Sequence, residues 1–300
     1  MKRKTIFGLV FILVLIMGIS LVNPFLLARP LNPLGTAFVQ TAAAGNIILN
    51  WTIFEHPLLN NQPSAVIFAT SNWNPGGASL GVYNDHATGV YYDIARFKWS
   101  VFNQDKVNMP VGAAFNILVP PAGAPAFIHA AAAANVVSNG TYIDNPLTNN
   151  RPDAILLVTP NWNPGGISTG TDHNHPIGVA YDARVGKWQI FNQDRILGFA
   201  DNASFNIYAA PVGPSVFIHR TSAANTGSNY TIIDSPLTNN HPGALVFVTP
   251  RFDAGGSLAD YNPHHIGVWY SNSMQKWSIY EQDRQNMHVG TNFHVFVIGE

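Results

Sequence analysis

Histidines that could bind a metal ion or move a proton recur at three places along this chain, each three residues before a glycine. They are His86, His175 and His264. An imidazole titrates near neutral pH and is a common metal ligand. The neighbours that would complete a metal site differ from place to place, so we predict no metal site. The pattern instead predicts a structural role, in which each ring hydrogen-bonds a loop carbonyl where a strand begins.

Aspartates that follow a glutamine also recur three times, at Asp105, Asp194 and Asp283. Glycoside hydrolysis usually requires two carboxylates at a set separation. Glutamate occurs only at Glu55, Glu281 and Glu300, and no two of these occupy equivalent positions. We therefore predict that the aspartates cap turns through backbone N–H groups and that the protein is not an enzyme; a hydrolase is the least favoured function. The sequence carries no nucleotide-binding motif, so we predict no cofactor.

Tryptophans that could stack on a sugar ring occur in two copies of the sequence Asn-Trp-Asn-Pro-Gly-Gly. An indole there would be flanked by amide groups able to hydrogen-bond a sugar; the residues are Trp73, Asn72, Asn74, Trp162, Asn161 and Asn163. Asn-Pro-Gly-Gly is equally good turn chemistry, and a tryptophan in it could fill the end of a barrel. Loops on rigid β scaffolds often carry binding, so these residues are the candidate ligand site, for an extracellular glycan or a surface protein.

Three glycosylation sequons also stand in register, beginning at Asn50, Asn139 and Asn229. In a secreted eukaryotic protein they could carry glycans. The simpler explanation is a turn asparagine followed by a strand threonine, and a bacterial source would favour it.

All these residues belong to an internal repeat of about 90 residues. The sequence Phe38-Val39-Gln40 is answered by Phe127-Ile128-His129 and Phe217-Ile218-His219, and later motifs keep the same offset. We predict three modules, at residues 38–120, 126–210 and 216–300, joined by short proline-containing linkers. The modules could form a stiff rod or a compact pseudo-threefold assembly, and the sequence leaves both open.

Each module reads as about six strands separated by Pro, Gly and Asn clusters. The segment from Tyr181 to Trp188 predicts a hairpin turn. In the strand that follows, Trp188 and Ile190 share one face and Gln189 and Phe191 share the other, so both faces carry large residues. The prediction is therefore an all-β protein of three small β-sandwich or barrel modules.

The first 37 residues predict an export segment. Lys2, Arg3 and Lys4 precede an almost unbroken apolar run from Ile6 to Val22. Such a segment is typical of a signal peptide, and its length also permits an uncleaved membrane anchor. Either outcome predicts a secreted or cell-surface protein, and it contacts a membrane only through this segment if the segment stays uncleaved.

The composition excludes several partners and chemistries. Hydrophobic residues make up 47% and charged residues only 10%, against roughly 25% charged in average soluble domains. With 15 basic and 16 acidic residues and no basic stripe, the chain is not expected to bind nucleic acid. It has no cysteine, which removes disulfides, thiol catalysis and cysteine-type zinc sites.

The run from Asn161-Trp162-Asn163-Pro164-Gly165-Gly166 through His175-Pro176-Ile177-Gly178-Val179 and Lys187-Trp188 to Phe191-Asn192-Gln193-Asp194 resembles a repeated extracellular module of bacteria, a domain of unknown function. The resemblance covers nearly all of residues 38–300. It implies a bacterial secreted setting and a tandem-repeat habit, but no activity. The third copy departs from it at Phe252, Ala254 and Glu281.

The sequence thus favours a non-enzymatic extracellular repeat protein that binds glycans or another extracellular partner. The alternative is a structural, self-associating protein of an envelope or matrix, since the repeats carry little charge.

Overall fold

The structure is a computed structural model that describes residues 34–252 and 261–299. Within these ranges the chain is all-β, with no α-helix and no helix long and apolar enough to span a membrane. The expected export segment up to residue 33 lies outside the described residues. So does the third-copy loop around Ala254.

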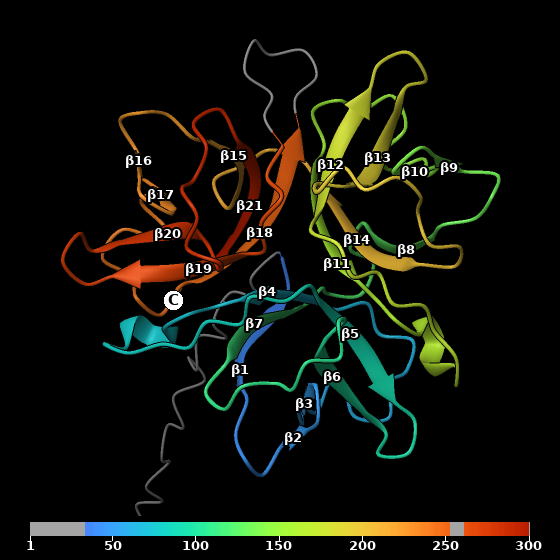
Figure 1. The fold of residues 1–300 in the computed structure, drawn as a ribbon, viewed down its shortest axis with the longest axis horizontal. Helices are drawn as coiled ribbons and strands as arrows, with labels where there is room; N and C mark the ends of the chain where they lie inside the picture. The colour runs from blue at the N-terminus through green and yellow to red at the C-terminus, as the bar shows by residue number, and fades with distance from the viewer. Residues whose placement is uncertain (1–33, 253–260, 300) are drawn as a thin grey trace, which may run out of the picture. The chain divides into compact units, whose positions relative to one another are not determined.

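The strands fall into three groups that follow the sequence repeat, and Figure 1 shows them as three lobes. Module 1 has β1 (Thr36–Thr41), β2 (Ile47–Ile48), β3 (Trp51–Ile53), β4 (Phe68–Ser71), the 3₁₀ turn η1 (Pro75–Gly77), β5 (Thr88–Asp93), β6 (Lys98–Asn103) and β7 (Ala114–Val119). Module 2 has β8 (Ala126–Ala130), β9 (Val136–Val137), β10 (Gly140–Tyr142), β11 (Ile155–Pro160), η2 (Pro164–Gly166), β12 (Ile177–Asp182), β13 (Lys187–Asn192) and β14 (Ser204–Ala210).

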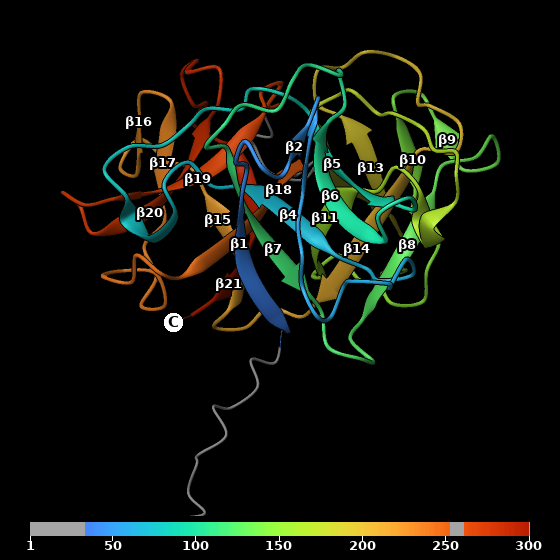
Figure 2. The same cartoon turned by 90° about the horizontal axis from the view of Figure 1, so that it is seen from below.

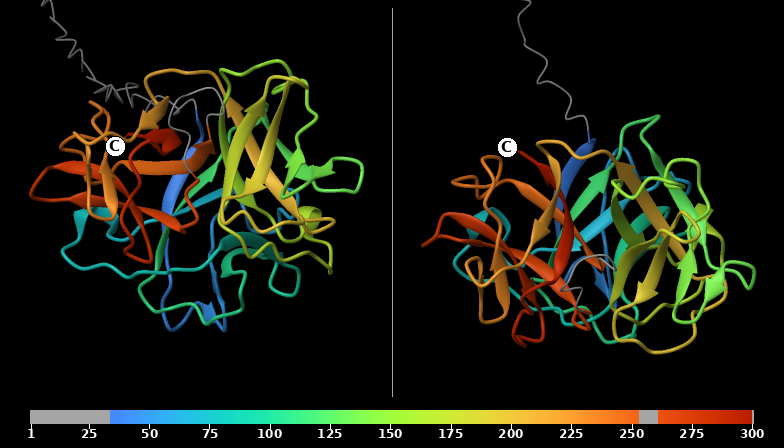
Figure 3. Two further views of the ribbon diagram at one scale, coloured as in Figure 1. Left: turned by 45° about the horizontal axis from the view of Figure 1, so that its top comes forward. Right: turned by 90° about the horizontal axis from the view of Figure 1, so that it is seen from above.

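Module 3 repeats the pattern. It has β15 (Val216–Arg220), β16 (Thr226–Gly227), β17 (Tyr230–Ile232), β18 (Leu245–Phe252), β19 (Ile266–Ser271), β20 (Lys276–Glu281) and β21 (Asn292–Ile298). The further views in Figure 3 show the same three groups, coloured blue to teal, green to yellow and orange to red.

Each module is a two-layer sandwich. In module 1 a three-stranded sheet of order β1-β7-β4 faces a four-stranded sheet of order β2-β3-β6-β5. Figure 2 shows the first of these sheets. Trp99 fills the space between the layers at 1% exposure, and its indole N–H donates to the carbonyl of Gln62 at 2.9 Å. Trp188 and Trp277 do the same in the other modules, so each sandwich has its own core.

The hairpin predicted between Tyr181 and Trp188 is confirmed. β12 pairs antiparallel with β13, with Asp182 opposite Lys187. Gly186 takes a φ of 67°, which favours glycine, and Asp182 accepts a hydrogen bond from the backbone N–H of Arg184. The turn chemistry read from the sequence therefore sets the register of these two strands.

A fourth core joins the modules and decides between a rod and a compact assembly. The outer faces of the three-stranded sheets meet on a common axis, where Phe68, Leu157, Phe247 and Phe296 are fully buried. These residues come from all three modules. The sheet faces opposite to each module's own core are therefore apolar as well, and the modules close into a pseudo-threefold body rather than a rod.

Polar side chains seal each boundary between modules in the same cyclic order. The backbone N–H of His173 donates to Gln104, that of Asn262 to Gln193 and that of Asn84 to Gln282, at 2.7, 3.1 and 2.9 Å. Each glutamine thus holds a loop of the next module, and the third glutamine returns to the first module. A backbone amide paired in this way avoids the cost of a buried, unsatisfied donor.

Candidate functional site

The loops with the sequence Asn-Trp-Asn-Pro-Gly-Gly lie on the boundaries between modules. The loop of module 1 continues alongside β19 of module 3, with Asn72 bridged to Val268. The loop of module 2 continues alongside β5 of module 1, with Asn161 bridged to Val90. In module 3 the same position extends β18, which pairs in parallel with β12 through Phe252 and Ala180. Each loop therefore adds a short parallel strand to its neighbour.

The loop asparagines are buried, and two of them bond the neighbouring module. Asn74 bonds both the N–H and the carbonyl of Tyr270, at 2.8 and 2.9 Å, and Asn163 does the same to Tyr92. Asn72 and Asn161 donate to Asn116 and Asn206, and all four loop asparagines are at most 2% exposed. The amides of Asn74 and Asn163 therefore hold the boundary, those of Asn72 and Asn161 bond within their own modules, and burial shields all four from a ligand.

The loop aromatic residues, by contrast, line open pockets at the boundaries. The pocket between modules 1 and 2 has a volume of about 380 Å³ and is lined by Asn50, Trp51, Tyr91, Phe102, Lys106, Trp162 and Asp172. The pocket between modules 3 and 1 has a volume of about 260 Å³ and is lined by Trp73, Tyr83, Asn229, Tyr230, Trp269 and Tyr280. We call these, with their counterpart around Phe252 and Tyr261 between modules 2 and 3, the boundary pockets.

The boundary pockets are built from equivalent repeat positions. Trp162 meets Tyr91 edge to face at 6.0 Å, and Trp73 meets Trp269 in the same way at 6.4 Å. A cation also recurs beside each pocket. Lys106 pairs with Asp172 at 3.3 Å, whereas Arg195 and Arg284 lie over tyrosine rings at 5.0 and 4.4 Å.

Sequence reasoning found Trp73 and Trp162 but missed the facing aromatic residues. Those facing residues, Trp51, Tyr91 and Trp269, come from other strands or other modules. A signal was present, since Trp51 and Tyr230 occupy the same sequon position in different copies. This shared position does not show which module contributes the facing residues.

The sequon asparagines serve the scaffold. Asn50 donates its side-chain amide to the carbonyl of Asn103 at 2.7 Å, and Asn139 and Asn229 make the same bond to Asn192 and Glu281. The sequon threonines Thr52, Thr141 and Thr231 are fully buried. This is the turn asparagine and strand threonine of the simpler explanation.

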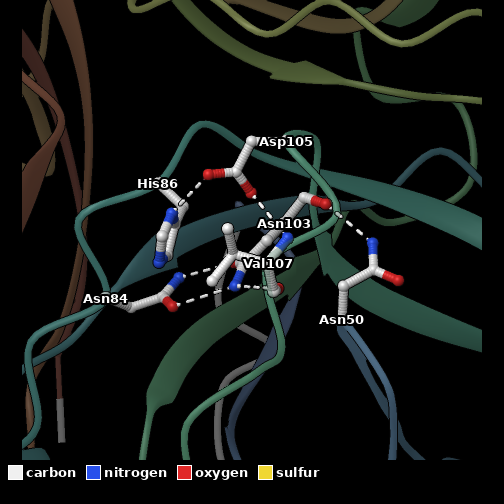
Figure 4. Close-up of polar contacts among 6 residues, drawn as sticks. All are labelled: Asn50, Asn84, His86, Asn103, Asp105 and Val107. Atoms are coloured by element: carbon white, nitrogen blue, oxygen red, sulfur yellow. Dashed lines mark hydrogen bonds and ion pairs between the residues drawn. The ribbon is translucent and has the colours of Figure 1, made fainter.

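The recurrent histidines and aspartates pair within each module. The ring Nδ1 of His86 lies 2.6 Å from Asp105, that of His175 lies 2.7 Å from Asp194, and that of His264 lies 2.6 Å from Asp283. Figure 4 shows the first pair. The second carboxylate oxygen accepts a backbone N–H two residues on, from Val107 in module 1. The partner of each ring is thus a carboxylate, not the loop carbonyl that we expected. The sequence did hold a signal for this pairing, because the spacing between the histidine and the aspartate is the same in all three copies.

A buried polar pair beside each histidine differs between modules. In module 1 the amides of Asn84 and Asn103 bond each other at 2.8 and 3.2 Å, as Figure 4 shows. In module 3 the second position is Glu281, whose carboxylate oxygens are buried without a hydrogen-bond partner among the described residues. Burial, the largest cause, and the charges of Asp283 and Asp85 raise the pKa of Glu281 to about 8, opposed by the Asn262 amide. This carboxyl is therefore mostly protonated at neutral pH.

None of these pairs forms a complete catalytic or metal centre. No group of three or more histidine, aspartate or glutamate side chains within the described ranges is close enough to hold a metal ion. No serine or threonine hydroxyl among these residues hydrogen-bonds His86, His175 or His264. A nucleophile activated by one of these imidazoles is therefore not assembled in this conformation.

A sequence model of one protein family matches the chain three times, at residues 30–106, 89–209 and 183–297. The chain therefore belongs to this family, which is described as a domain of unknown function, DUF7452. No curated protein and no solved structure gives a significant match.

Proposed function

We propose that this three-module protein is a non-enzymatic extracellular binding protein whose boundary pockets hold glycans. One observation carries the proposal: equivalent repeat positions form an aromatic pocket at each boundary. Rings with an exposed face next to polar groups are the chemistry that holds a sugar ring. Three sites on one body would also strengthen attachment to a repeating ligand through effective concentration.

The distribution of tryptophans supports this assignment. The chain has seven tryptophans. Three of them fill the module cores at no more than 1% exposure. The other four, Trp51, Trp73, Trp162 and Trp269, all line boundary pockets. Contiguous exposed apolar surface with a polar rim often marks a ligand-binding site.

The proposed location is a bacterial cell surface or the secreted fraction. The support is the basic and apolar N-terminal segment, together with the lack of cysteine. Fractionation of cells that express the full chain would test it, and recovery only from the cytoplasm would contradict it.

Tryptophan fluorescence tests the pockets directly, because the core indoles are shielded and the pocket indoles are not. A panel of soluble glycans titrated into the full chain should give ligand-dependent quenching. Trp51→Ala should weaken binding at the boundary between modules 1 and 2 several-fold, since about 1 kcal/mol of stacking is lost. Phe97→Ala, at a 55% exposed ring outside the boundary pockets, is the matched control. Binding that survives Trp51→Ala and Trp162→Ala together, or no response to any glycan, would refute the assignment.

Self-association is the second candidate, favoured by exposed apolar side chains. Leu80, Leu197, Leu49 and Val111 are 65–84% exposed. A structural role predicts that the full chain forms oligomers whose proportion rises with concentration in light scattering. A monomer at all concentrations would exclude this alternative.

A further inference from the structure

A cavity lies on the pseudo-threefold axis, apart from the boundary pockets. The ends of β4 and β11 and the middle of β18 meet there with the starts of β5, β12 and β19. Each module contributes equivalent residues to the wall: Thr70, Thr159, Thr249, His86, His175 and His264. Its volume is about 100 Å³, well above the roughly 10–15 Å³ that a cavity needs to hold one water.

The three threonines form a closed ring. The backbone N–H of Ala69 donates to Thr159, that of Val158 to Thr249 and that of Val248 to Thr70, at 3.1, 3.0 and 3.3 Å. Each hydroxyl accepts one bond from the neighbouring module and keeps one lone pair and its own proton. The ring therefore presents three equivalent polar groups.

The three histidines present a second set of three. Their Nδ1 atoms are held by Asp105, Asp194 and Asp283, which leaves Nε2 of each ring as the remaining polar atom. No hydrogen bond within the described residues uses these Nε2 atoms. A carboxylate that accepts a hydrogen bond from Nδ1–H fixes the tautomer in which Nε2 is a lone-pair acceptor.

The charge around the cavity is negative. The carboxylates of Asp105, Asp194 and Asp283 stand behind the three imidazoles, and the described residues that line the cavity include no lysine or arginine. His265 also lines the wall. A cation is thus favoured over an anion at this position.

We propose that this axial cavity binds a hydrated divalent cation, such as Mg²⁺, through the water molecules of the ion. The histidines are not close enough together to hold a metal ion directly. Mg²⁺ dehydrates reluctantly and keeps an octahedral shell of waters. An octahedron seen down its threefold axis has two opposite triangles of waters. In the proposed complex, one triangle faces the threonine ring and the other donates to the three Nε2 atoms.

Paramagnetic Mn²⁺ tests the site on the full chain, by water-proton relaxation. Bound Mn²⁺ should be displaced by Mg²⁺ and also by hexaamminecobalt(III), which keeps its six ammonia ligands and can bind only through them. Asp105→Asn, Asp194→Asn and Asp283→Asn together should weaken Mn²⁺ binding at least about tenfold. The exposed Asp153→Asn makes the same chemical change away from the cavity and should have no effect.

Three results would overturn the proposal. They are no relaxation enhancement by the native chain, equal binding by the triple variant, and displacement by Mg²⁺ without displacement by hexaamminecobalt(III), which would show direct coordination. Each substitution keeps an oxygen to accept the turn N–H. If the triple variant nevertheless unfolds, Asp194→Asn alone should still weaken binding by a smaller factor, and unchanged binding by this folded single variant would be equally decisive.

Discussion

Glu281 should make the stability of the protein fall as the pH rises, and Glu281→Gln should remove this fall. The unfolded chain loses the proton near pH 4.5, whereas the folded chain keeps it to about pH 8. Between these values the native state holds one proton more than the unfolded state, so the free energy of unfolding decreases with rising pH. The stability linked to the buried acid is complete below pH 4.5 and lost by the time the pH exceeds 8.

The magnitude follows from the two pKa values. A difference of about 3.5 units at 1.36 kcal/mol per unit gives a loss of at most roughly 5 kcal/mol across the whole range. Glutamine has nearly the same shape and no charge, so Glu281→Gln lacks this loss. The free energy of unfolding of the variant should therefore rise relative to that of the wild type by about 1.4 kcal/mol for each pH unit between 5 and 8. Above pH 8 the difference should stay constant.

Urea denaturation at pH 5, 7 and 9, followed by tryptophan fluorescence, measures the difference between the two proteins. Other titrating groups are common to both and cancel. Glu55→Gln is the control, because the Glu55 side chain is 68% exposed. Glu281→Asn copies the residue of the other two modules and should behave like Glu281→Gln. A wild-type to variant difference that does not change with pH would refute the buried, protonated carboxyl.

Further changes probe the module boundaries and a buried histidine. Gln193→Ala removes the acceptor of a buried backbone N–H at a boundary. The free energy of unfolding measured in urea should therefore fall by roughly 1–3 kcal/mol. An unchanged urea midpoint would contradict this role of Gln193. Gly166→Ala should destabilise more than Gly165→Ala: both have positive φ, but only at Gly166 would a Cβ come within 2.7 Å of a proline across the boundary. Equal losses in thermal melts would refute that reasoning. Burial lowers the pKa of His129 from 6.5 to about 4, so the native chain loses stability as the pH falls through this range. His129→Gln, which copies Gln40, should lose less in acid titrations followed by circular dichroism, and coincident curves would argue against it.

The role of a polar side chain could be predicted from the sequence where its hydrogen-bond partner lies in the same module. Gln40 of module 1 occupies the position of His129 and His219 in the other modules, and both residue types can hydrogen-bond. His129 and His219 each bond a buried threonine at 2.8 Å, and Gln40 makes the same bond to Thr52. Such contacts join residues 12 apart on strands in the two facing sheets of one module, which pack together within that module.

Only part of the candidate site could be predicted from the sequence, because the rest of it depends on contacts between modules. The sequence singled out Trp73 and Trp162, but the asparagines beside them bond residues up to 196 positions away. In a repeat, equivalent residues are separated by the same offset in every copy, and this offset does not depend on which modules contact each other. The cyclic order of the boundaries, and with it the other wall of each pocket, is therefore absent from the pattern.

The sequence by itself determined the period of about 90 residues, the all-β modules and the turns, because alternation, turn residues and repeats are local properties of the chain. Only the tertiary structure decided that the modules close around an axis. Closure depends on the second apolar face of each three-stranded sheet, as with Phe68 and Phe247, which meet only when three modules pack together. The boundary pockets and the axial cavity exist because of that closure, since every one of them is lined by residues from more than one module.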